Sequence, residues 1–249
     1  MPAESPRFDD GLKRRPATEF VSLLVFRPLA YLLVRLLWRT PVRPEHLVLT
    51  HGLLGLAAAG LLAENHYPAA AFVLQLVTLL DGADGQLARL RGQVSQLGRY
   101  LDTEVDFLVH LGLFAVLAKV CGGGPALLGL VFLTFVLSLD YNLVAAHYAD
   151  DDRPPPAGGL AEEVLAFVYT VLFAWQDGFI RRLERRLNPP PRWFYLLLAN
   201  LGRSTQFAIL GLFLLAGHPC GYLVFLAVTT GVVFLVYAIR IWRSIRFPR

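Results

Sequence analysis

The sequence predicts an all-α integral membrane protein with six transmembrane helices and additional amphipathic helices at the membrane interface. Its residues are 55% hydrophobic and 17% charged, and its mean hydropathy is +0.51. Soluble domains are about 45–50% apolar and about 25% charged. Several apolar stretches also reach roughly the 20 residues that a membrane-spanning helix needs. These observations exclude an ordinary soluble globular fold.

Six stretches have the length and composition of spanning helices. They are residues 47–64, 68–90, 97–120, 125–148, 193–217 and 220–241. Short turns rich in Gly and Pro follow the first, third and fifth stretches, at Asn65–Pro68, Cys121–Pro125 and Gly217–Gly221. An even number of spans places both ends of the chain on one side of the membrane.

Two other stretches have an amphipathic character. Residues 17–39 contain Arg27 and Arg35, which are costly at mid-membrane but suit a helix on the inner leaflet. In Leu160–Leu187 the apolar core reaches only about 18 Å at about 1.5 Å per residue, against a hydrocarbon core of about 30 Å. We therefore expect a second surface-lying helix there. The main alternative is a seven-span chain in which one of these two stretches crosses.

Basic residues give the predicted orientation. Of the 23 Lys and Arg residues, only Lys119 falls at an outward end of the six predicted spans. The positive-inside rule then places both termini and the turn at 82–97 in the cytoplasm. Nucleic-acid binding is excluded, because the basic residues flank membrane segments and form no recognised motif. Cys121 and Cys220 lie in outward turns, where a disulfide is possible, but the sequence favours two unpaired cysteines.

An acid-rich run links the second and third predicted spans, and we call it the Asp motif. It reads Asp81-x2-Asp84-Gly85-x2-Ala88-Arg89-x8-Gly98-x3-Asp102-x3-Asp106. Such a pattern would arise by chance in about one of ten million chains of this length at average residue frequencies. On helices, the first two aspartates are i,i+3 neighbours and the last two are i,i+4 neighbours, so each pair shares one face.

Paired carboxylates beside a bilayer repel one another unless a positive charge lies between them. Oxygen ligands of this kind suit Mg²⁺ or Mn²⁺, ions that also bind pyrophosphate. The pattern therefore predicts a centre for two metal ions that faces the cytoplasm. The alternative is that the acids are solvated residues at the membrane border, paired with Arg89, Arg91 and Arg99.

The Asp motif resembles the signature of the CDP-alcohol phosphotransferase family of membrane enzymes of phospholipid synthesis. The resemblance implies transfer of a phosphatidyl or phosphoalcohol group from a CDP-linked donor, most often CDP-diacylglycerol, to an alcohol acceptor with release of CMP. It implies that Asp81, Asp84, Asp102 and Asp106 bind Mg²⁺ or Mn²⁺ and that Asp106 is the general base. It also implies a homodimer as a further possibility.

By the same resemblance, Gly85, Arg89 and Ser95 contact the CDP moiety. Physically, Gly85 lets the nucleotide approach the helix, and Arg89 offers a fork of donors to phosphate. Family members often carry Pro-Asn-x-x-Thr before the first span, but Glu45 and Val48 stand at the Asn and Thr positions here. Those two nucleotide contacts are not carried over.

Acceptor residues are less well defined by the sequence. Arg203 and Asp140 lie in predicted spans beside the site, and Arg203 is placed to bind a phosphate on a phosphorylated polyol, or else to pair with Asp140. His51, His110 and His147 are isolated on helices and are interpreted as structural. Residues 1–46 form a predicted cytoplasmic segment, and 47–249 form the catalytic membrane domain, with 149–191 as linker and surface helix.

Two other functions were weighed for the same residues. An intramembrane prenyltransferase also binds a metal–pyrophosphate group through Asp-rich motifs, but its motifs lie on separate helix pairs without the Gly-Ala-Arg frame. A divalent-cation transporter needs carboxylates near mid-membrane on several helices, whereas these four aspartates lie within one short segment. The resemblance therefore favours the phospholipid-synthesising transferase, active in the cytoplasmic membrane.

Overall fold

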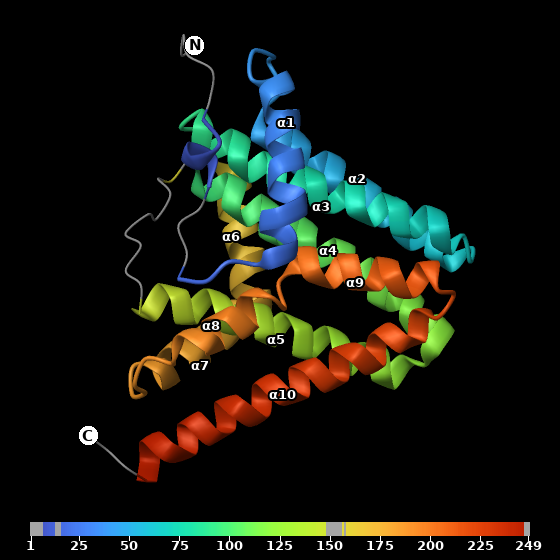
Figure 1. Ribbon diagram of the computed structural model, residues 1–249. Coiled ribbons are helices and arrows are strands. Elements are labelled where there is room, and N and C mark those ends of the chain that lie inside the picture. Colours follow the sequence, from blue (N-terminus) through green and yellow to red (C-terminus); the bar gives the residue numbers. More distant parts are fainter. Residues whose placement is uncertain (1–6, 13–15, 148–155, 157, 247–249) are drawn as a thin grey trace.

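A computed structural model describes residues 7–12, 16–147, 156 and 158–246 of the protein (Figure 1). All regular elements of this part are helical, and the described residues contain no strand. The predicted all-α fold class is therefore confirmed. Residues 149–155 of the predicted linker lie outside the described part.

The helices follow one another along nearly the whole described chain. Their bounds are η1 Asp9–Gly11, η2 Ser22–Phe26, α1 Arg27–Leu37, α2 Pro44–Ala63, α3 Tyr67–Leu90, α4 Gln96–Cys121, α5 Gly123–His147, α6 Leu160–Leu172, α7 Ala174–Glu184, α8 Arg192–Ala199, α9 Arg203–Leu215 and α10 Pro219–Arg246. Helices α2, α3, α5, α9 and α10 all extend toward the right-hand end of the bundle in Figure 1, with α10 inclined to α2 and α3, while α1 packs across α3. Prolines in the first turns of α2 and α3 suit these helix starts, since a proline there gives up no intrahelical hydrogen bond.

Five of the six predicted spans correspond to single helices, namely α2, α3, α4, α5 and α10. The prediction of one continuous helix over 193–217 is wrong. Helices α8 and α9 replace it and meet at a bend of 50°. A distant residue stabilises this break, because Glu19 Oε1 accepts a hydrogen bond of 2.6 Å from the backbone N–H of Thr205 in the first turn of α9. Burial raises the pKa of Glu19, against the hydrogen bonds from Thr205 and Ser204, which lower it.

The prediction of one continuous helix over Leu160–Leu187 is also wrong, while its place at the membrane surface stays a prediction. Helices α6 and α7 are bent by 62° at Phe173, and they pack against α4 and α5. The buried carboxylate of Asp177 attaches this pair to the bundle. It accepts hydrogen bonds of 2.7 Å from Ser138 and from Asn142 of α5, and one of 2.5 Å from Tyr169 of α6. A local amphipathic pattern does not reveal such long-range contacts.

Length and composition qualify three helices of the described part as membrane spans, namely α2, α5 and α10, and up to five spans if each bent pair counts as one. Helices α3 and α4 are also long enough, at 24 and 26 residues, or about 36 and 39 Å. They carry the Asp motif, and its charges lower their hydropathy. The chain is thus an integral membrane protein, and the number of six crossings stays a prediction.

Two glycines bring α2 close to α4. A Cβ atom on Gly52 would lie 2.5 Å from Val105 Cγ1, and one on Gly55 would lie 2.4 Å from Val109 Cγ2. Any side chain at these positions would therefore force the helices apart. This approach places the N-terminal half of α2 against the stretch of α4 that carries Asp106, and it positions the site described below.

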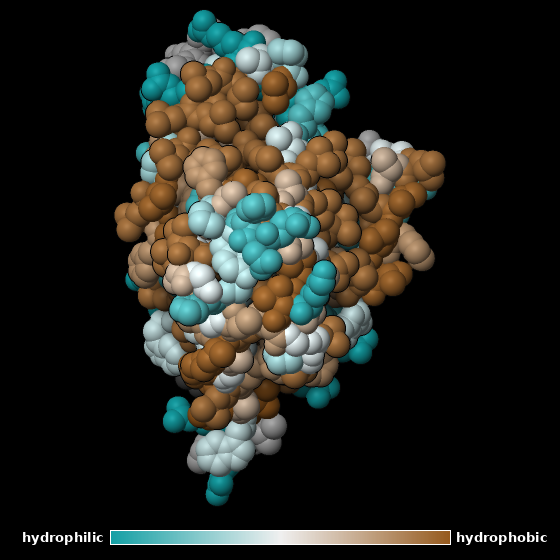
Figure 2. All heavy atoms as spheres, turned by 90° about the vertical axis from the view of Figure 1, so that its right-hand side faces the viewer, coloured by the Kyte–Doolittle hydropathy of each residue, from teal (hydrophilic) through white to brown (hydrophobic). Residues whose placement is uncertain are grey.

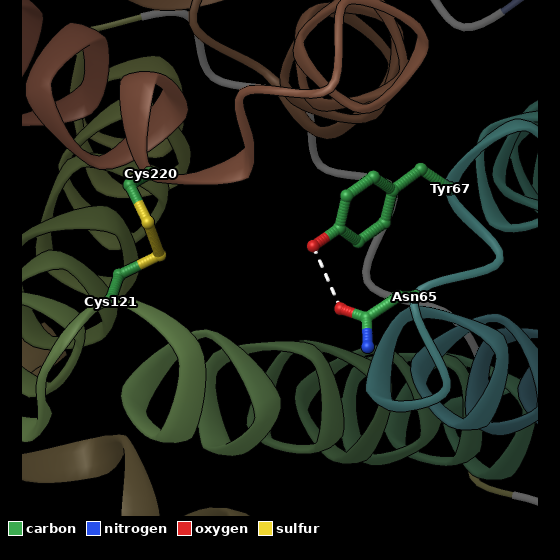
Figure 3. Close-up of a disulfide and its surroundings, with 4 residues drawn as sticks. All are labelled: Asn65, Tyr67, Cys121 and Cys220. Atoms are coloured by element: carbon green, nitrogen blue, oxygen red, sulfur yellow. Dashed lines mark hydrogen bonds between the residues drawn. A yellow bond between two sulfur atoms is a disulfide. The ribbon is translucent and has the colours of Figure 1, made fainter.

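The three predicted turns occur, and a disulfide joins two of them (Figure 3). Cys121 at the end of α4 is bonded to Cys220 at the start of α10, with a Cα–Cα distance of 5.4 Å. The prediction of two unpaired cysteines is therefore wrong. The partners are 99 residues apart in sequence, and only the packing of α10 on α4 and α5 brings them together. Figure 2 views this end of the bundle, where hydrophobic residues surround a central hydrophilic patch.

Candidate active site

The Asp motif forms a helical hairpin whose two acidic faces meet. Asp81 and Asp84 lie on α3, while Asp102 and Asp106 lie on α4, after the short turn between the two helices. The guanidinium of Arg203, at the start of α9, bridges the pairs. Its Nη2 lies 3.1 Å from Asp81 Oδ1 and 3.8 Å from Asp102 Oδ2, and its Nη1 contacts Asp106 Oδ2. We call the four aspartates the acid cluster.

His51 of α2 enters the acid cluster from the opposite side, and its place there was not predicted. The side chain is 0% exposed. Its Nδ1 lies 3.3 Å from Asp84 Oδ2 and its Nε2 lies 3.5 Å from Asp106 Oδ1. The prediction that His51 has a purely structural role therefore needs revision. The sequence signal that could have found it is the adjacent Gly52-x-x-Gly55 face, which marks the side of α2 that touches α4.

These residues fit a divalent metal ion. His51, Asp81, Asp84 and Asp102 each offer one ligand atom, and the four atoms lie within 4.8 Å of one another. Several of their buried atoms have no hydrogen-bond partner among the described residues, namely His51 Nδ1 and Nε2, Asp84 Oδ2 and Asp102 Oδ1. Buried polar atoms of this kind require a partner, and carboxylate oxygens with one imidazole nitrogen suit a cation such as Mg²⁺ or Mn²⁺.

A cavity that is too narrow in this structure to admit a water molecule adjoins the acid cluster between α3, α4 and α9. Its lining residues are Val77, Thr78, Asp81, Asp106, Arg203, Ser204 and Phe207. Most of these residues are thus polar, with two carboxylates and one guanidinium among them, and Val77 and Phe207 are the apolar members. Asp140, the other predicted acceptor residue, lies on α5 and is not among these lining residues. In the described part of the chain, Arg203 has ion pairs with Asp81, Asp102 and Asp106.

Two of the three residues predicted to contact the CDP moiety, Gly85 and Arg89, lie one turn apart on α3. A Cβ atom on Gly85 would lie 3.2 Å from Nη1 and 3.3 Å from Nη2 of Arg89, so the missing side chain lets the guanidinium lie across the helix. Arg89 Nε donates a hydrogen bond of 2.7 Å to the carbonyl of Gly11 in η1. The N-terminal segment therefore reaches the predicted nucleotide site, which the sequence did not indicate.

Two other residues of the Asp motif region have clear local roles. Ser95 is the N-cap of α4, where its Oγ accepts a hydrogen bond of 3.0 Å from Gly98 N, and its predicted contact with the CDP moiety stays a prediction. Arg91 donates to four backbone carbonyls of the turn between α1 and α2, those of Leu37, Trp38, Thr40 and Val42. This positioning role was missed, because no sequence pattern pairs an arginine with carbonyls that lie far from it along the chain.

A buried Asp/His cluster inside a helical membrane bundle, next to a cavity with an arginine, defines a membrane protein with a candidate metal centre. The sequence model of the CDP-alcohol phosphatidyltransferase family matches residues 41–242. The chain therefore belongs to this family. The match covers all of the spanning helices and the whole acid cluster.

Three named relatives share part of the sequence. The inner membrane protein YnjF of Escherichia coli is 39% identical over 84 residues, which are 34% of this chain and 40% of YnjF. Proteins named bifunctional IPC transferase and DIPP synthase are 34% identical over 102 residues in Thermococcus kodakarensis and 31% identical over 103 residues in Rubrobacter xylanophilus. These matches cover 38% and 39% of this chain, but 23% and 24% of the relatives. The chain thus spans less than half the length of each.

Proposed function

We propose that this protein is a CDP-alcohol phosphotransferase. It moves a phosphatidyl or phosphoalcohol group from a CDP-linked donor, with CDP-diacylglycerol as the favoured one, to the hydroxyl of an alcohol acceptor and releases CMP. The observation that carries the proposal is the convergence of all four aspartates of the Asp motif beside one cavity in a chain of this family.

The aspartates of the acid cluster and the neighbouring residues of α3 have different roles in this reaction. Asp81, Asp84 and Asp102, with Asp106 as the fourth ligand of a two-metal centre, would hold the divalent metal, which would offset the charge of the donor's pyrophosphate and of the departing CMP. Arg89 donates to the diphosphate, and Gly85 lets the nucleotide approach α3. The acceptor oxygen forms the new bond to the β-phosphorus as the bond from that phosphorus to the CMP oxygen breaks. Asp106, on the cavity wall, takes the acceptor's proton.

Arg203 is placed to exchange partners when the acceptor arrives. Its guanidinium contacts Asp106 and lines the cavity, so a phosphate on the acceptor can replace the carboxylates as its partner. That exchange would release an oxygen of Asp106 to accept a proton. A phosphorylated polyol therefore suits this cavity better than a neutral alcohol.

The proposal is tested by CMP release from radiolabelled CDP-diacylglycerol by purified protein. The acceptor panel holds glycerol phosphate, inositol phosphate, inositol and serine, and a CDP-amino alcohol replaces the donor in a parallel series. We expect CMP release with a phosphorylated polyol and none from an Asp81→Asn variant. Failure with every pair of substrates, together with metal-dependent cation flux in vesicles, would favour the transporter instead.

We predict that the N-terminal contact with Arg89 strengthens donor binding. A Cβ atom at Gly11 would lie 3.3 Å from Leu90 Cδ1 and 3.6 Å from Gln86 Cγ, so Gly11→Val displaces η1 and removes the acceptor of Arg89 Nε. The KM for donor should rise about five- to tenfold, equivalent to about 1 kcal/mol, with kcat unchanged. Gly60→Val is the control, because no atom lies within 4 Å of a Cβ there. An unchanged KM in Gly11→Val would contradict this role.

We infer that the α3–α4 turn faces the cytoplasm, where CDP-linked donors occur. The basic residues support this side, and so does the disulfide at the far end of α4, since disulfides persist in oxidising compartments. Because Cys121 and Cys220 are bonded, single cysteines can be added to the natural chain. A cysteine at Asn65 should react with an impermeant maleimide in intact cells, whereas one at Gln93 should react only after permeabilisation. Labelling of Gln93→Cys in intact cells would place the acid cluster outside and contradict the proposed activity.

A further inference from the structure

His51 is the buried side chain of the site whose chemistry the proposed function does not use. It is 0% exposed, and neither of its ring nitrogens has a hydrogen-bond partner among the described residues. The other buried histidine of this region, His110, differs, because its Nδ1 lies 2.8 Å from the backbone carbonyl of Asp106. Each nitrogen has only a carboxylate oxygen nearby, at 3.3 Å from Nδ1 and 3.5 Å from Nε2, and a wholly buried imidazole in such a place needs a ligand or a proton shared with a carboxylate at each nitrogen.

The packing of α2 holds the ring between the two acidic helices. Gly52 and Gly55 allow α2 to approach α4, and the preceding residue, His51, thereby inserts between Asp84 of α3 and Asp106 of α4. The two nitrogens point to different carboxylates. Nδ1 faces Asp84, which belongs to the group of four candidate metal ligands, and Nε2 faces Asp106, which does not.

Arg203 leaves this part of the acid cluster open. Its ion pairs are with Asp81, Asp102 and Asp106, while Asp84 is 6% exposed and faces His51. The buried side of the cluster, formed by His51 and Asp84, therefore offers a nitrogen and an oxygen to a cation that the guanidinium does not displace. Metal-bound histidines usually donate their other ring N–H to a carboxylate or carbonyl, which fixes the orientation of both groups.

We propose that His51 is a nitrogen ligand of the metal through Nδ1 and that its Nε2–H donates to Asp106 Oδ1. An imidazole in the ligand set shifts preference from Mg²⁺ toward Mn²⁺, since nitrogen ligands suit transition metals better than Mg²⁺. The second contact holds the carboxylate of Asp106 toward the cavity, which makes His51 a positioning residue for the base. Only this second role rests on the proposed function, because metal binding needs no substrate.

The test is pulsed electron paramagnetic resonance of Mn²⁺ bound to the purified full-length protein without substrate. We expect modulation from a directly bonded nitrogen in the wild-type spectrum, and a shift to the ¹⁵N frequency when histidine is ¹⁵N-labelled. His51→Gln should lose the modulation and bind Mn²⁺ at least about tenfold more weakly, with a smaller change for Mg²⁺. His110→Gln is the matched control and should keep the modulation.

A wild-type spectrum without nitrogen modulation overturns the ligand assignment by itself, so the proposal stays falsifiable even if His51→Gln does not fold. Modulation that persists in a folded His51→Gln protein overturns it as well. The positioning role is tested by the kinetics of His51→Gln at saturating Mn²⁺. The kcat of this variant should stay at least about tenfold below that of the wild type, while its KM for the donor should return nearly to the wild-type value. A fully restored kcat overturns that role alone. Nitrogen modulation in a protein that releases no CMP would refute the proposed function and leave the metal ligand standing.

Discussion

Replacing Asp106 by Asn is expected to lower the rate of CMP release by about a hundred- to ten-thousandfold, the usual contribution of a general base. The amide keeps the size of the side chain and can still contact Arg203, but it cannot accept the proton of the acceptor hydroxyl. Donor binding should weaken much less, because Asp81, Asp84 and Asp102 remain for the metal, and the four-residue ligand group does not include Asp106. Turnover and donor affinity, measured separately on one preparation, check this expectation.

Asp102→Asn supplies the matched control, since Asp102 lies one helical turn earlier on α4 and also pairs with Arg203. As a member of the ligand group, it should lose metal and donor affinity together. The general-base assignment fails if Asp106→Asn abolishes donor binding as completely as Asp81→Ala does. It also fails if the two α4 variants show the same ratio of lost turnover to lost affinity.

Two observations argue against the rival interpretation, in which the acids are border residues paired with nearby arginines. Arg91 is held by four backbone carbonyls, and Arg99 donates to Tyr141 at 3.1 Å and lies over the ring of Tyr100. Asp81, Asp102 and Asp106 have ion pairs with the guanidinium of Arg203, which comes from α9, far along the chain. The aspartates thus turn toward the interior of the bundle, where a cation is required.

Local sequence patterns predicted most of the fold and the acidic residues of the site. Hydropathy located α2, α3, α4, α5 and α10, and helical spacing placed each aspartate pair on one face. The breaks between α6 and α7 and between α8 and α9 could not be predicted from local patterns, because the contacts of Asp177 and Glu19 that stabilise them involve other parts of the chain. A window of apolar residues contains no information about such partners.

The missed site residues share this cause. His51 and Gly11 reach the Asp motif only because α2 and η1 pack on α3 and α4. Neither residue type is diagnostic alone, since a single histidine on an apolar helix is more often structural. The disulfide was not predicted for the same reason. The sequence alone does not show that the turns with Cys121 and Cys220 lie together at one end of the bundle.

Removal of divalent metal is expected to abolish CMP release without unfolding the protein, and Mn²⁺ or Mg²⁺ should restore it. Activity should be lost because the carboxylates of the acid cluster would otherwise repel the donor's pyrophosphate. The fold should persist because Arg203 already places a positive charge among Asp81, Asp102 and Asp106. CMP release and thermal unfolding, measured on one sample with excess chelator and again after metal is restored, check both parts.

Arg203→Met separates the two sources of positive charge. Without the guanidinium, the acid cluster has only the metal to offset its repulsion, so chelation should lower the unfolding temperature of the variant by more than it does in the natural protein. A ligand that binds only the folded state at a hundredfold excess over its Kd stabilises by about 2.7 kcal/mol, so restored metal should recover the unfolding temperature. Full CMP release by the natural protein in excess chelator would refute the metal requirement. Equal metal dependence of unfolding in the two proteins would show instead that Arg203 does not substitute for the metal, and its place in the cavity would then reflect acceptor binding alone.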